Sequence, residues 1–81
     1  MDDSDVQDHI ETLVAEEHRL FAAGERDGGH TIDERARLEE IRVSLDRYWD
    51  LLRQRRAQEE FGLDPDGASM RPPDTVEGYE Q

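Results

Sequence analysis

The chain has 81 residues, of which 40 % are charged and only 33 % hydrophobic, and its formal net charge is -12. A chain of this length forms one small domain at most, and so polar a composition leaves little material for a deep core. Such an acidic surface repels nucleic acid and anionic membranes, and it attracts cations and basic partners. The composition therefore argues against a nucleic-acid-binding protein and against a multidomain enzyme.

Cysteine is absent, so the chain has no disulfide framework, no thiolate zinc site and no cysteine nucleophile. The first residues, "MDDSDVQD", are acidic where a secretory signal would be basic and then apolar. No apolar run approaches the ~20 residues that span a bilayer. We therefore expect a cytoplasmic, non-enzymatic protein without a cofactor or a membrane association.

The apolar pattern predicts a first helix over about residues 5–23. In "SDVQ", Ser4 is expected to cap this helix, with Gln7 reaching back to it. One face is apolar at the helical spacing of Val6, Ile10, Leu13 and Leu20, and Val14 and Phe21 widen this stripe. Gly24 is the expected end of the helix, and residues 24–30 form the expected turn.

A second helix is predicted over about residues 32–61. It opens with a capping box, "TIDE", in which Thr31 is the cap and the side chain of Glu34 is expected to accept a hydrogen bond from the backbone N–H of Thr31. A heptad seam follows, formed by Leu38, Ile41, Leu45, Tyr48 and Leu52, with Trp49 and Leu51 beside it. Gly62 and Pro65 end the pattern.

A short turn between two amphipathic helices predicts an all-α antiparallel hairpin over residues 1–61. One register agrees along its length: the pairs are Leu20 with Leu38, Leu13 with Leu45, Ile10 with Tyr48, and Val6 with Leu52. The same register puts Glu17 opposite Ile41, where its carboxylate is expected to reach Arg37 or Arg42, or a residue of a partner chain, and so to fix the register.

Two helices bury only one side of each other. The apolar residues beside the seam would then need a second hairpin to cover them, which predicts a homodimer that forms a four-helix bundle. The expected interface residues are Val14, Phe21, Trp49 and Leu51.

Residues 62–81 form a tail, "GLDPDGASMRPPDTVEGYEQ", which carries all three prolines and no periodicity. This composition predicts an extended segment that is disordered unless something binds it. Val76 and Tyr79 are its apolar points, and we expect them to dock on a partner or back on the bundle.

The stretch "LDRYWDLLRQRR" mixes arginines with aromatic residues, as some nucleic-acid-binding strips do. However, every arginine of the second helix has a carboxylate three or four residues away, as Arg42 has Asp46 and Arg55 has Glu59. Phosphate binding needs a concentrated positive field, and here the charge is cancelled locally. The stretch is interpreted as part of the helix seam.

The turn also allows a calcium hypothesis. On the twelve-position calcium loop, Glu25 and Asp27 fall at the third and fifth positions, and Thr31 and Glu34 at the ninth and twelfth. Ala23 stands at the first position, where an aspartate is usual. A capped turn is the simpler interpretation, and weak calcium binding by these four residues remains an alternative.

The phrases "LVAEEHRL", "WDLLRQRRA" and "VEGY" resemble a family of short bacterial proteins known as domain of unknown function 2630. The resemblance covers nearly the whole chain and implies a helical protein without an assigned activity or catalytic residues. We therefore predict a small acidic interaction or scaffold protein with an unidentified partner, and its acidic surface favours a basic one. An acidic decoy that imitates nucleic acid for a basic partner is a further alternative.

Overall fold

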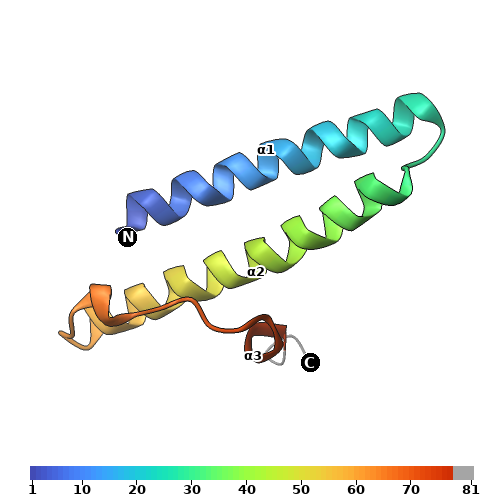
Figure 1. Cartoon of the computed structure of the whole chain (residues 1–81). Coiled ribbons are helices and arrows are strands. Elements are labelled where there is room, and N and C mark those ends of the chain that lie inside the picture. The colour runs from blue at the N-terminus through green and yellow to red at the C-terminus, as the bar shows by residue number, and fades with distance from the viewer. Residues whose placement is uncertain (78–81) are drawn as a thin grey trace.

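The computed structural model describes residues 1–77 and consists of an antiparallel helical hairpin with a docked tail (Figure 1). Helix α1 (Asp3–Asp27) and helix α2 (Ile32–Glu60) lie side by side and are joined by a tight turn. The molecule measures 51 by 26 by 16 Å. The predicted all-α hairpin is confirmed. None of the helices within residues 1–77 is long and apolar enough to cross a membrane.

The cap of α1 is Asp2, so the predicted cap at Ser4 is wrong. The backbone N–H of Asp5 donates to Asp2 Oδ1 at 2.9 Å, and the N–H of Asp2 donates to Asp5 Oδ2 at 3.2 Å. This reciprocal pair satisfies two amides at the positive end of the helix dipole with carboxylates, which are stronger acceptors there than a hydroxyl and an amide.

The end of α1 also differs from the prediction, because the helix passes through Gly24 and continues to Asp27. Gly28 adopts the left-handed conformation that stops it, with φ of 76°, and the N–H of Gly29 closes the turn on the carbonyl of Gly24 at 2.7 Å. The capping box of α2 is confirmed: Glu34 N–H donates to Thr31 Oγ1 at 3.0 Å, and Thr31 N–H donates to Glu34 Oε1 at 2.8 Å.

The hydrophobic core lies between the two helices toward the open end of the hairpin. Its buried cluster consists of Val6, Ile10, Leu51 and Leu52, against which Val14, Leu45 and Tyr48 pack. Ile41 is fully buried nearer the turn. Both residues of the predicted pair Val6 with Leu52 belong to this cluster, and Tyr48, the predicted partner of Ile10, packs against it and stacks on the ring of His9 with centroids 5.0 Å apart.

The tail departs from the predicted extended form. Gly62 (φ of 74°) reverses the chain, and the N–H of Leu63 bonds to the carbonyl of Gln58 at 2.7 Å. A 3₁₀ turn, η1 (Pro65–Gly67), and a short helix, α3 (Pro73–Glu77), follow and both contact α2. The tail runs back along α2 on the side away from α1 (Figure 1).

Candidate functional site

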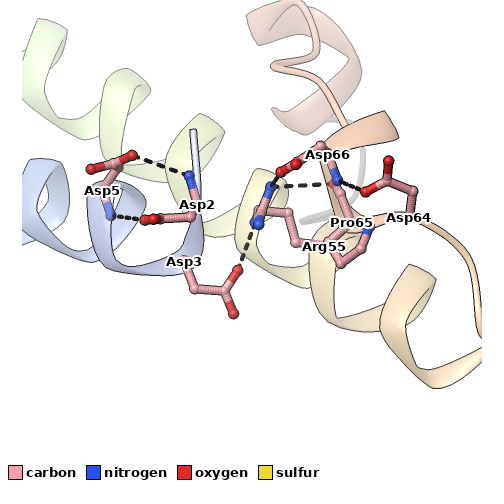
Figure 2. Close-up of polar contacts among 7 residues, drawn as sticks. All are labelled: Asp2, Asp3, Asp5, Arg55, Asp64, Pro65 and Asp66. Atoms are coloured by element: carbon pink, nitrogen blue, oxygen red, sulfur yellow. Dashed lines mark hydrogen bonds and ion pairs between the residues drawn. The ribbon is translucent and has the colours of Figure 1, made fainter.

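The guanidinium of Arg55 joins three segments of the chain at the open end of the hairpin. Its Nε donates to Asp3 Oδ1 of α1 at 2.6 Å, and its Nη1 donates to Asp66 Oδ1 of η1 at 2.9 Å and to the carbonyl of Pro65 at 3.3 Å (Figure 2). The residue is only 5 % exposed. The tail therefore cannot leave α2 without removing a partner from a buried cation.

The predicted partner of Arg55, Glu59, is wrong because Arg55 follows the buried Leu51 and Leu52 at four and three residues. That spacing puts its side chain beside the core, where Asp3 and Asp66 bind the guanidinium, whereas Glu59 lies about one turn farther along α2 and is exposed. Hydrogen bonds from Arg55 lower the pKa of Asp66, and the hydrogen bonds to Asp3 and Asp66 raise the pKa of Arg55. Arg55 and Asp66 therefore stay charged near neutral pH, and their ion pair serves to hold structure.

A second group of polar contacts holds the middle of the tail. Gln54 Nε2 donates to the carbonyl of Ser69 at 2.9 Å, and Arg47 Nε donates to the carbonyl of Arg71 at 2.9 Å. Arg71 Nε lies 3.4 Å from Asp50 Oδ2, which also accepts from Gln54 at 2.9 Å. Since Asp50 is only 4 % exposed, its charge is compensated mainly by the tail.

Apolar contacts complete the docking of the tail. Ala68 and Met70 pack against the core cluster, and Val76 is 2 % exposed. A shallow hollow remains between α2 and the tail, and Trp49, Asp50, Arg71 and Val76 are among its lining residues. Tyr79, the other expected docking residue, lies outside the described residues.

A different surface, which we call the open face, is defined by two lines of residues at intervals of seven. They are Gln7, Val14 and Phe21 on α1, and Arg35, Arg42, Trp49 and Arg56 on α2. Two hollows between the helices contain members of both lines, one with Phe21, Arg35 and Arg42 and the other with Gln7, Trp49 and Arg56. The two lines therefore border one surface of the hairpin.

The four predicted dimer-interface residues fall into two groups, those on or beside the open face and one that is buried in the core. Phe21 and Trp49 are 47 % and 45 % exposed, and Val14 is half-buried between the core and the open face. Leu51 is only 4 % exposed and belongs to the core that the tail helps to cover. Leu51 is therefore not part of the open face, because it lies on the flank of α2 that the tail occupies.

The cross-helix ion pair uses Glu16, so the expected pairing of Glu17 with Arg37 is wrong. Arg37 Nε and Nη2 donate to the two carboxylate oxygens of Glu16 at 2.6 and 2.7 Å, and Nη1 reaches Glu40 at 3.1 Å. These hydrogen bonds lower the pKa of Glu16 and raise that of Arg37. Glu17 lies instead in the hollow beside Phe21 and is half-buried.

The calcium hypothesis finds little geometric support at the turn. Ala23, Glu25 and Asp27 lie within α1, so they do not wrap around a loop. Thr31 and Glu34 bind each other as a cap, and the hydrogen bond from the Thr31 backbone lowers the pKa of Glu34. Within residues 1–77, no three His, Asp or Glu side chains gather closely enough to hold a metal ion.

The sequence interpretation missed Arg55, Asp50 and Asp66 as the residues that hold the tail. A signal for Arg55 was available in its spacing from Leu51 and Leu52, which places a cation beside the core. Asp66 belongs to "DPDG", in which Asp64 accepts from the N–H of Asp66 at 3.0 Å and so shapes the turn that presents the Asp66 carboxylate (Figure 2).

Comparison with known proteins agrees with the whole-chain resemblance. The family model described as "Protein of unknown function (DUF2630)" matches residues 2–81. Uncharacterized proteins of Mycobacterium tuberculosis (strain ATCC 25618 / H37Rv) and Mycobacterium bovis are 48 % identical over 77 residues, which cover 95 % of this chain and 88 % of each relative. No solved structure matches the chain significantly. Because the match extends over nearly all of the sequence, the chain belongs to the DUF2630 family of proteins of unknown function.

Proposed function

We propose that this protein is a non-enzymatic interaction protein that first associates with a second copy of itself through the open face. The observation that carries the proposal is the placement of Phe21 and Trp49, two large half-exposed aromatic side chains, along one face of the hairpin. Aromatic residues together with arginines are enriched at protein interfaces, and a hairpin gains a second layer by pairing in this way.

The charge distribution favours one arrangement of the two copies. Residues 1–34 carry eleven acidic residues and two arginines, whereas the α2 line of the open face carries three arginines. A two-fold axis parallel to the helices would place α1 of one copy over α2 of the other, with Glu11 and Glu17 near those arginines. An axis across the helices would instead place the acidic α1 on its own copy.

The shifted carboxylate pKa values support a structural role for these groups. Glu16, Glu34, Glu39 and Asp66 all have lowered pKa values because each accepts hydrogen bonds from an arginine or a helix cap. A general acid or base needs a pKa near the working pH, and these shifts lead away from it. The carboxylates are used to hold helices and the tail in place.

Sedimentation equilibrium of the full chain tests the proposal. We expect a dimer for the natural chain and a monomer of unchanged helicity for Phe21→Ser combined with Trp49→Ser. Phe61→Ser is the matched control, because Phe61 is 79 % exposed but lies at the end of α2 outside the open face. A natural chain that remains monomeric at high concentration, or a Phe61→Ser variant that dissociates equally, would contradict the proposal.

A further inference from the structure

The flank of α2 that faces the tail recognises main-chain groups. Arg47, Gln54 and Arg55 donate to the carbonyls of Arg71, Ser69 and Pro65. These donors run antiparallel to the tail, so that each successive tail carbonyl meets a donor nearer the start of α2. Recognition through carbonyls accepts an extended segment whatever its side chains, and other contacts must supply the selectivity.

Selectivity on this flank comes from one charge and from apolar contacts. Asp50 is nearly buried and lies 3.4 Å from the guanidinium of Arg71. Met70 and Ala68 pack on the cluster that contains Leu51. The flank therefore matches a segment in which small or apolar residues precede an arginine, as in "ASMR" at residues 68–71.

We infer that this flank, formed by Arg47, Asp50, Leu51, Gln54 and Arg55 and called the tail groove below, is a peptide-docking site. The tail is its resident intramolecular ligand, and the tail of a second copy is the occupant that can replace it. An identical segment makes the same contacts, and exchange of an identical element between copies is a low-cost route to association. The groove and the open face adjoin at Trp49, which lines the hollow beside the tail, but the hydrogen bonds and the ion pair that hold the tail use none of the open-face residues, so this inference does not depend on the proposed dimer.

The attachment of the tail permits such exchange. The tail joins α2 through the reversed turn at Gly62, and within residues 1–77 the hydrogen bonds that connect it to α1 run through Arg55. Asp66, its ion-pair partner there, is 69 % exposed at the side chain, whereas Arg55 is only 7 % exposed, so an exchanged tail has to supply the same carboxylate to Arg55. The covalent link gives the chain's own tail a high effective concentration, which is why the groove is closed in the free chain.

Titration of a fluorescent peptide of residues 63–81 into the full chain tests the inference by anisotropy. Val76→Asp in the chain should release its own tail, because that change puts a charge at a site that is 2 % exposed. We expect the peptide to bind this variant at least about tenfold more tightly than the natural chain, since apparent affinity scales with the fraction of open grooves. Ser69→Ala is the matched control, as the Ser69 side chain is exposed and its carbonyl remains.

Two changes identify the groove as the binding site. Asp50→Asn in the Val76→Asp chain, or Arg71→Glu in the peptide, should remove most of the gained affinity, because each breaks the Asp50–Arg71 pair. Met70→Ser in the chain is a second variant that should open the groove, and it tests the inference independently if Val76→Asp does not fold. A peptide that binds neither opened variant, or binds natural and opened chains equally, overturns the inference. The titrations are repeated with Phe21→Ser present, so that failure of the proposed dimer remains a separate result.

Discussion

The imidazole of His30 lies directly over the α-carbon of Gly24. His30 Nε2 is 2.9 Å from the carbonyl oxygen of Leu20, a hydrogen bond that requires the proton on Nε2, and the ring meets Phe21 edge-on with centroids 5.9 Å apart. A Cβ atom at position 24 would clash with the imidazole ring of His30 at Nε2. The glycine inside α1 is thus explained by the residue that follows the turn, which packs back onto the last turns of the helix.

This contact predicts a coupling between positions 24 and 30. A glycine inside a helix usually costs ~0.5–1 kcal/mol relative to alanine. Here Gly24→Ala should give less than that gain or should destabilise, because the new methyl displaces the His30 ring from Leu20. In a His30→Ala chain the same change should be stabilising. We expect a coupling energy of about 1 kcal/mol or more in a double-mutant cycle by urea unfolding, and additive effects would contradict the packing described here.

Acid should weaken the fold through its ion pairs. The folded-state pKa values of Glu16, Glu34, Glu39 and Asp66 lie below their ordinary values of 4.5 for glutamate and 3.8 for aspartate. A lowered folded-state pKa means that the unfolded chain binds protons first, so this stability is complete above about pH 4.5 and is lost as the pH falls through the folded-state values. Melting temperatures measured by circular dichroism should fall between pH 5 and pH 3.

The control for the acid prediction is Glu16→Gln, which removes the carboxylate that receives two hydrogen bonds from Arg37. This variant should be less stable than the natural chain at pH 7 and should lose less on acidification. Equal losses in the two chains would show that Glu16 does not contribute to the pH dependence.

The junction at Arg55 predicts that the N-terminus and the tail are held together. Arg55→Met keeps the length of the side chain but removes the donors to Asp3 and Asp66. Amide exchange across residues 63–71 should become faster by about an order of magnitude, and the first turn of α1 should also exchange faster. Arg56→Met is the matched control, because Arg56 is exposed on the open face. Faster exchange in the tail alone would mean that the junction does not couple the two segments.

Calcium should not bind at the turn. Glu25 and Asp27 lie in α1, and Glu34 is engaged by Thr31, so coordination would require the end of α1 to unwind. We expect no heat on calorimetric titration with calcium and no rise in the melting temperature. Heat that Glu34→Gln abolishes would reinstate the calcium hypothesis.

The local pattern determined the two long helices and their antiparallel order. Apolar residues at helical spacing, the cap at Thr31 and the glycine after α2 act within a few residues, so the sequence is sufficient to find them. The same reasoning placed Phe21 and Trp49 beside the seam, and both are half-exposed there.

Only the tertiary structure decided what lies between distant residues. Arg55 binds Asp3 and Asp66 and not Glu59, its neighbour on α2. The ring of His30 packs against Gly24. The tail, which has no periodic pattern, packs Met70 on the core cluster and buries Val76. These contacts depend on which side chains the register brings together across the fold and on where the chain reverses at Gly62. Helical spacing along one segment predicts neither these contacts nor the path of the tail after Gly62, because a side chain's partner in space is set by the packing of the whole chain.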